Sequence, residues 1–328
     1  MKNSARSGET MGQRAKCALM AACFLTIGAL MFPSSAAAQA KVGTTGAQFL
    51  ELGVSARAMG MAEAFTAVSN DVSAVYYNPA GLTSLVGKDA MFTYVKMPAD
   101  IGFGFAAFGI PLESIGGVLG IGASGLTSGY MTERTYNQGT MNGTGREFRY
   151  DDLALSVGYG RYLTDRFSVG VNVRYIGEFA ADKTASGWSA DVGTSYDTGF
   201  RNFKIAMVIT NFGPDLKFID RAYPLPINFK FGGAIDVLQG ANNSLTFAAE
   251  GSHPSDNLEK YNAGLEYTFK DRFMLRGGYR FNYDIDGFTL GGGIRVPFSK
   301  DSELRVDYAY QDFGILTQVH RFSLGIAF

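Results

Sequence analysis

Apolar residues alternate with small or polar residues over much of the chain after Asp89, and this spacing predicts β-strands. The last such segment would place four apolar side chains on one face: Phe322, Leu324, Ile326 and Phe328. From Asp89 onward the sequence divides into about fourteen segments of roughly ten residues, the length that a tilted strand needs to cross a bilayer. An even number of such strands predicts an all-β fold, a transmembrane antiparallel barrel.

The connections between these segments are expected to alternate in length. Short turns are predicted at Thr164-Asp165 and Lys270-Asp271, and longer loops over Gly125–Arg149, Glu178–Gly187 and Phe212–Pro226. Short turns on one side and longer loops on the other are typical of transmembrane barrels. A soluble β-sandwich or propeller also shows alternation and stays an alternative for this pattern.

The predicted final strand ends on the aromatic Phe328. A strand of this kind at a C-terminus resembles the closing strand of bacterial outer-membrane barrels, in which a terminal Phe is part of the signal read by the membrane-insertion machinery. The resemblance implies that Phe328 is an insertion signal and that the barrel-insertion machinery is a partner. It also implies a location in the lipid of a bacterial outer membrane.

The first forty residues have the pattern of an export signal. A basic start precedes the apolar run Cys17–Phe32, and Ala38–Ala40 forms a small-x-small cleavage site. The run is shorter than the ~20 residues of a membrane helix, so we predict a cleaved signal peptide over residues 1–40 rather than an anchor helix. Both cysteines, Cys17 and Cys23, lie in this segment, so the mature chain would contain no disulfide.

Composition agrees with a barrel and excludes a nucleic-acid binder. The chain has 29 basic and 30 acidic residues and no basic tract, so it offers no surface for phosphate backbones. Hydrophobic residues make up 46% of the chain, yet no apolar run after Ala40 is long enough for a membrane helix. Apolar residues spread by alternation explain both facts.

The strand faces opposite the apolar ones carry charged residues, which would be costly against lipid and are therefore expected to face a lumen. The candidate lumen-lining residues are Arg174, Glu266, Arg276, Arg280, Arg305 and Asp307. They would form either a salt-bridged ladder that stiffens the wall, which is the preferred interpretation, or a binding or conduction path.

Candidate catalytic and metal-binding chemistry is sparse. The mature chain has only two histidines, His253 and His320, and His253 lies beside Ser252 in a predicted loop where a solvated role is expected. Gly120–Gly125 has the spacing of a dinucleotide fingerprint but no helix pattern follows it, and Asp284–Gly287 lacks the other ligands of a calcium loop. We therefore predict no enzymatic activity, no metal and no cofactor.

The segment before the first strand, residues 41–86, is rich in Ala and Gly and shows no alternation. Pro79 would interrupt any regular ladder, and small residues allow close packing in a confined space. This predicts a small N-terminal plug, or hatch, inside a barrel formed by residues 87–328.

The stretch Gly46–Leu82 resembles the PorV/PorQ family, a branch of the FadL-like outer-membrane barrels. The Gly-Ala-Gln-Phe-Leu opening at Gly46–Leu50 points to that branch, and the Ser-Ala-Arg-Ala-Met-Gly-Met segment around Arg57 also carries the resemblance. The Asn-Pro-Ala-Gly element is shared across the wider FadL-like group. The resemblance implies a fourteen-stranded barrel whose hatch motif comprises Asn78, Pro79, Ala80, Gly81 and Arg57.

The resemblance implies two kinds of function. PorV-like proteins are non-enzymatic components of the type IX secretion system; they capture secreted proteins through a conserved C-terminal domain and pass them to a surface attachment complex. This is the function expected here, with secretion-system proteins and secreted cargo as partners. The alternative is FadL-like uptake of hydrophobic compounds such as fatty acids, with a hydrophobic small molecule as the ligand.

Overall fold

The computed structural model describes residues 42–137, 140–285, 287–299 and 302–328. The predicted signal peptide lies outside these residues. The chain divides into two units, Met1–Ala40 and Lys41–Phe328, and all described residues belong to the second. Among the described residues, no helix is long and apolar enough to span a membrane.

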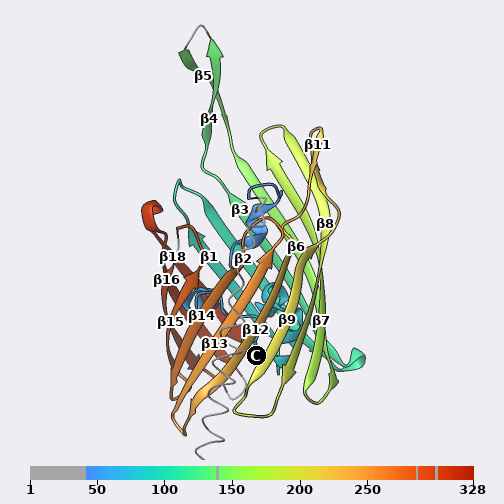
Figure 1. The fold of residues 1–328 in the computed structure, drawn as a ribbon, viewed down its shortest axis with the longest axis vertical. Helices are drawn as coiled ribbons and strands as arrows, with labels where there is room; N and C mark the ends of the chain where they lie inside the picture. Colours follow the sequence, from blue (N-terminus) through green and yellow to red (C-terminus); the bar gives the residue numbers. More distant parts are fainter. Residues whose placement is uncertain (1–41, 138–139, 286, 300–301) are drawn as a thin grey trace, which may run out of the picture. The chain divides into compact units, whose positions relative to one another are not determined.

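Fourteen antiparallel strands form a closed barrel, which confirms the predicted fold (Figure 1). The barrel closes where the first strand pairs with the last, from Asp89 opposite Ala327 to Lys96 opposite His320. The strands of the wall are β1 (Asp89–Lys96), β2 (Gly102–Leu112), β3 (Gly117–Thr127), β6 (Tyr150–Thr164), β7 (Phe167–Ala180), β8 (Lys183–Asp197), β9 (Lys204–Phe212), β12 (Asn228–Gln239), β13 (Asn243–Pro254), β14 (Lys260–Phe269), β15 (Phe273–Phe281), β16 (Phe288–Pro297), β17 (Glu303–Asp312) and β18 (Gln318–Ala327).

The alternation in the sequence reflects the two faces of the wall. In β18, Phe322 and Leu324 are more than half exposed, whereas Arg321 and Ser323 are buried. The apolar side chains therefore point outward and the polar ones inward, the reverse of a soluble protein. This inverted arrangement suits a wall that faces lipid.

Two small two-stranded sheets lie at one end of the barrel, which we call the hairpin end; the other is the turn end. The strands β4 (Met131–Asn137) and β5 (Thr140–Phe148) project from the hairpin end as a ribbon, and β10 (Leu216–Phe218) pairs with β11 (Arg221–Tyr223) (Figure 1). Short 3-10 helices connect other strands at Glu113–Ile115 and Gly314–Leu316.

One predicted loop is wrong. The sequence was expected to form a longer connection over Glu178–Gly187, but β7 continues to Ala180 and β8 begins at Lys183, so only Ala181 and Asp182 turn. Both strands extend beyond bilayer length, at 14 and 15 residues. Strand ends that extend beyond the membrane do not need apolar residues on their outward face. Their polar residues therefore have the sequence pattern of a loop.

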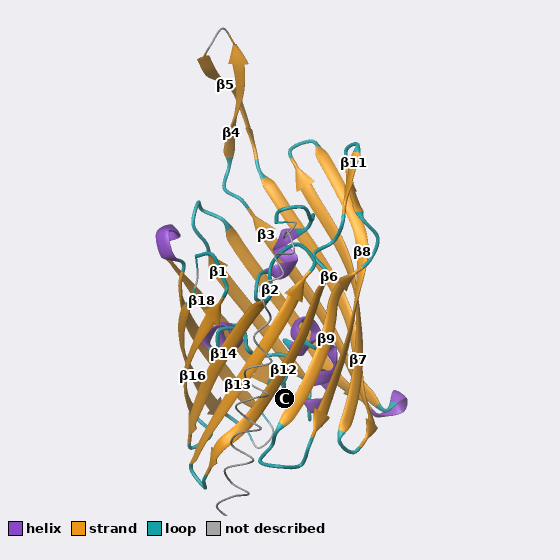
Figure 2. Ribbon diagram, viewed as in Figure 1, coloured by secondary structure: helices purple, strands orange, loops and turns teal. Residues whose placement is uncertain are grey.

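The segment before β1 lies inside the barrel as a hatch (Figure 2). It begins at the hairpin end, where the Gly46 N–H donates to the Pro224 carbonyl over 3.0 Å, and ends at the turn end, where the Lys88 N–H donates to the Phe328 carbonyl over 2.8 Å. Its helices are short: 3-10 helix η1 (Gln48–Glu51), α2 (Ala56–Gly60), α3 (Ala74–Tyr77) and 3-10 helix η2 (Pro79–Ser84).

The main hydrophobic core lies between the hatch and the inner face of the wall. Phe65, Val72 and Leu82 of the hatch are fully buried and belong to the same cluster as Phe103 and Phe105 of β2. Burying large apolar side chains contributes about 1.5–3 kcal/mol each. The hatch is thus a packed part of the fold as well as an obstruction in the lumen.

Candidate functional site

The Asn78-Pro79-Ala80 segment lies directly on the backbone of three wall strands. Three glycines of β6, β7 and β8, which we call the glycine seat, face it: Gly160, Gly170 and Gly193. A Cβ atom on Gly170 would lie 2.2 Å from the Pro79 carbonyl carbon, and one on Gly193 would lie 2.0 Å from the Asn78 Oδ1. Only a residue without a side chain permits this approach.

Polar contacts fix the same segment. The Asn78 Oδ1 accepts from the Ala80 N–H at 3.1 Å, and its Nδ2 donates to the carbonyls of Thr66 (3.1 Å) and Thr194 (3.2 Å). Asn78 thereby caps η2 and ties the hatch to β8. The Ser168 hydroxyl donates to the Ala80 carbonyl at 3.2 Å.

A second attachment, the Arg57 anchor, joins α2 to β14 through Arg57, Asp71 and Glu266. The Arg57 guanidinium donates to both Glu266 carboxylate oxygens, at 2.9 and 2.8 Å, and lies 3.3 Å from Asp71. Arg276 of β15 contacts the same Glu266 at 2.6 Å and continues to Asp307 at 2.6 Å. Bidentate contacts of this kind are strong and geometrically specific.

The environment reinforces the charges of this anchor. Burial alone would lower the pKa of Arg57, but the Glu266 carboxylate beside it raises that pKa above its usual value. Burial alone would raise the pKa of Asp71, but the nearby Arg57 guanidinium and hydrogen bonds from Ser73 hold it below its usual value. Both groups are therefore charged at neutral pH.

The remaining predicted lumen residues lie on the inner face at separate places. Arg174 of β7 pairs with Asp191 of β8 at 2.8 Å and lies over the ring of Tyr76 in the hatch. Arg305 of β17 contacts Asp89, whose other oxygen accepts from the Val72 N–H of the hatch at 3.1 Å. Several of the wall charges thus contact the hatch, in addition to their neighbours in the wall.

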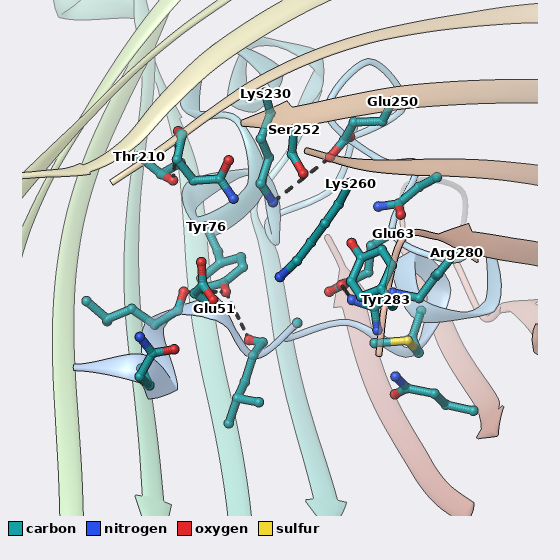
Figure 3. Close-up of a pocket in the computed structure, with 18 of the residues that line it drawn as sticks. Glu51, Glu63, Tyr76, Thr210, Lys230, Glu250, Ser252, Lys260, Arg280 and Tyr283 are labelled. Carbon is teal, nitrogen blue, oxygen red and sulfur yellow. Dashed lines mark hydrogen bonds and ion pairs between the residues drawn. The ribbon is translucent and has the colours of Figure 1, made fainter. Parts of the chain in front are cut away.

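A pocket of about 350 Å³ lies between the hatch and the inner face of the wall (Figure 3). The hatch contributes the stretch from Gln48 to Gly53 together with Glu63 and Tyr76. Lys260 of β14 extends into the middle of the pocket, as Figure 3 shows. The chain therefore places both charged and hydrogen-bonding groups around one pocket.

One ion pair at the pocket joins the hatch to the wall, and a second joins two wall strands. Arg280 of β15 contacts Glu63 at 3.2 Å and lies over the ring of Tyr283 at 3.9 Å. Lys230 of β12 lies 4.0 Å from Glu250, which also accepts from the Phe65 and Thr66 N–H groups of the hatch. Burial raises the pKa of Glu51 and that of Tyr283. Both shifts favour the neutral, protonated form of the side chain.

The other predicted positions lie away from the pocket. Phe328 is half exposed at the turn end, and the Lys88 ammonium lies 5.8 Å from its ring centre. His253 lies in β13 rather than in the predicted loop and contacts Glu259 at 3.2 Å, and His320 contacts the Tyr308 hydroxyl at 2.7 Å. The described residues contain no group of three or more His, Cys, Asp or Glu side chains that could hold a metal ion.

Several site residues were missed in the sequence: Glu51, Glu63, Lys230, Lys260, Tyr283 and Arg321. One signal was available, because Glu51 and Glu63 are isolated charges in an Ala/Gly-rich segment expected to enter a confined lumen. A buried charge needs a partner of opposite sign. Arg321 also alternates with the outward apolar residues of the last strand, which places it on the inner face.

Comparisons with known proteins support the fold. No family model matches the chain, and no curated protein matches it. Among solved structures, the Ralstonia pickettii toluene transporter TbuX is 14% identical with a TM-score of 0.58; 84% of this chain and 97% of that one are covered. A Pseudomonas aeruginosa FadL homologue is 14% identical with a TM-score of 0.53, over 84% and 98%.

The Pseudomonas putida toluene transporter TodX is also similar, at 11% identity and a TM-score of 0.51, with 78% of this chain and 92% of that chain covered. At this level of identity, the similarity is one of fold. The chain thus has the fold of the FadL-like outer-membrane barrels.

Proposed function

We propose that this protein is an outer-membrane uptake barrel in which the hatch controls the passage of small compounds. The observation that carries the proposal is the hatch itself, which crosses the lumen from the hairpin end to the turn end and is attached to the wall on both sides. The outward apolar face of the wall supports a location in lipid. We place the hairpin end at the cell surface, because external loops of such barrels are the longer ones.

The named neighbours are toluene transporters and a FadL homologue, which favours uptake over other roles for this fold. Hydrophobic compounds are therefore one cargo class to test. The pocket between hatch and wall has a different character, because charged and amide side chains contribute much of its lining. A compound that enters it must satisfy those groups.

The test is to release the hatch without disturbing the wall. Replacing both Asn78→Ala and Pro79→Ala removes the cap of η2 and its contact with the glycine seat, so we expect faster entry of a small dye into vesicles that contain the barrel. The control is Asn243→Ala at the turn end, whose Oδ1 accepts from the Tyr267 hydroxyl at 3.0 Å within the wall. Equal dye entry in the wild type, the double variant and the Asn243→Ala control would contradict the proposal.

A second candidate is the PorV-like secretion role, and it stays a prediction. The observation that favours it is the β4–β5 ribbon, which projects from the hairpin end where a secreted protein would be received (Figure 1). Mass spectrometry of proteins and lipids that co-purify with the gently solubilised barrel separates the two roles. Secreted proteins with a common C-terminal domain would support secretion, and a bound small compound without a protein partner would support uptake.

A further inference from the structure

The charges that line the pocket do not balance. Five cationic side chains and three carboxylates line it. The carboxylates Glu63 and Glu250 pair with Arg280 and Lys230, and Arg174 pairs with Asp191 in the wall. Among the described residues, the remaining charges are two cations, Lys260 and Arg321, and the carboxyl group of Glu51.

Arg321 is the more informative of the two cations. It lies on the inner face of β18, only 5% exposed, and lines the pocket. Its Nε and Nη1 atoms are buried, and neither has a hydrogen-bond partner among the described residues. A guanidinium carries five donors, and leaving them unsatisfied away from bulk water is costly.

Lys260 offers a second positive charge to the same volume. Its ammonium group lies 5.1 Å from the ring centre of Tyr283, and no carboxylate among the described residues lies within ion-pair distance of it. Glu51 also lines the pocket, and burial raises the pKa of its carboxyl group whereas the positive charge of Lys260 acts in the opposite direction. An incoming anion would meet two cations, and the carboxylates of the pocket that compete with it are Glu51 and Glu63.

The rest of the lining indicates what the remainder of the ligand must be. Amide and hydroxyl groups of the wall surround the cations: Thr210, Asn211, Asn228, Ser252 and Asn262. The Asn228 and Asn262 Oδ1 atoms are buried and lack a hydrogen-bond donor among the described residues. Such acceptors favour a hydroxyl-bearing body over an acyl chain or an aromatic ring.

We propose that this pocket binds a small hydrophilic organic anion, with its carboxylate at Arg321 and Lys260 and its hydroxyl groups on the wall amides. A compound of the size of a six-carbon sugar acid fits the volume of about 350 Å³. This assignment goes beyond the proposed uptake role, since it names a site and a ligand class. It also differs from toluene, which two of the named neighbours transport.

The test is calorimetric titration of the full-length barrel in detergent with three probes. Together they separate the contribution of the carboxylate from that of the hydroxyl groups. Glucuronate has both the carboxylate and the hydroxyl groups, glucose lacks the charge, and octanoate lacks the hydroxyl groups. We expect glucuronate to bind about tenfold more tightly than either of the others, the size expected for one charge-assisted hydrogen bond. Glucose or octanoate binding as tightly as glucuronate would overturn the proposal.

Variants locate the site. Arg321→Met and Lys260→Met should each weaken glucuronate binding about tenfold. The control Lys183→Met, at the exposed turn between β7 and β8, should leave it unchanged. Lys260 is only partly buried, so its variant keeps the test valid if Arg321→Met fails to fold. Unaltered glucuronate affinity in folded Lys260→Met would contradict the assignment.

Dye entry into vesicles, measured on the same preparations, reports on the uptake role separately. If the barrel binds glucuronate but release of the hatch does not change dye entry, the binding site is supported and the proposed uptake function is contradicted. If dye entry depends on the hatch but the barrel binds no glucuronate, the uptake function is supported and the assignment of the binding site is contradicted.

Discussion

The hatch is held to the wall in two ways that differ in chemistry. On the side of β14 and β15, the Arg57 anchor uses buried charges, with Glu266 shared between Arg57 and Arg276. On the side of β6 to β8, the glycine seat uses shape and neutral hydrogen bonds around Asn78 and Pro79. The two attachments lie on different sides of the same plug.

The difference matters for how a plug can be released. Buried ion pairs are strong while complete, but removing one partner leaves a charge without compensation. Close packing on glycine has no such dependence on charge and changes only when atoms are added or removed. A hatch with attachments of both kinds has ionic contacts that respond to solution conditions and a steric contact that does not.

Breaking the ionic attachment should have the largest effect. Arg57→Met leaves the buried Asp71 and Glu266 each without one cation, which costs about 3–5 kcal/mol in buried pairs. If this weakens only the closed position of the hatch, dye entry should rise about a hundredfold or more. Dye entry into vesicles measures it, with circular dichroism to show that the barrel is intact.

The matched control for that variant is the pair Arg57→Met with Glu266→Met. Removing both partners leaves fewer isolated charges, and Arg276 keeps Asp307 at 2.6 Å. Dye entry should therefore be slower in the double variant than in Arg57→Met alone. Faster dye entry in the double variant than in Arg57→Met would contradict the view that uncompensated buried charge is what weakens the anchor.

Adding one methyl group to the glycine seat should have a smaller effect. Gly170→Ala would place its Cβ 2.2 Å from the Pro79 carbonyl carbon, so hatch or strand must shift. Overpacking of this kind costs about 1–3 kcal/mol, which corresponds to about tenfold faster dye entry. Dye entry is measured as for Arg57→Met.

Gly232→Ala in β12 provides the matched control. This glycine also faces the hatch, but its Cβ would lie 3.5 Å from its nearest neighbour, which is ordinary contact. If Gly170→Ala and Gly232→Ala change dye entry equally, the glycine seat has no special role.

The two attachments also differ in how far the sequence predicts them. Alternation in the wall strands predicts the barrel, because lipid outside and a polar lumen inside impose a period of two. The same alternation places Glu266 and Arg276 on the inner face. It does not pair Glu266 with Arg57, 209 positions away, because the pairing depends on how the hatch lies in the lumen.

The glycine seat is harder to foresee. Gly170 and Gly193 occupy inward positions like many other glycines of the chain, and only the position of Pro79 distinguishes them. The loop wrongly expected over Glu178–Gly187 has a related cause, since alternation loses its meaning where strands leave the membrane. Local pattern thus predicts the faces of strands, whereas contacts between the hatch and the wall require the folded structure.

Low pH should weaken the Arg57 anchor and leave the glycine seat unchanged. We expect this effect on dye entry to be smaller than that of Arg57→Met or Gly170→Ala. The pKa of Asp71 lies below its usual value in the closed hatch, so its stabilising contribution is complete at neutral pH and is lost as pH falls through that lower pKa. The loss of the Asp71 contribution should therefore raise dye entry in the wild type as pH falls below about 4. Asp71→Asn should reduce this rise, because its side chain has no proton to gain.

The glycine seat contains no ionisable side chain, so Gly170→Ala should increase dye entry by the same factor at every pH and leave the acid response as in the wild type. An acid response that Asp71→Asn leaves intact would remove Asp71 from the ionic attachment and assign the response to another buried group.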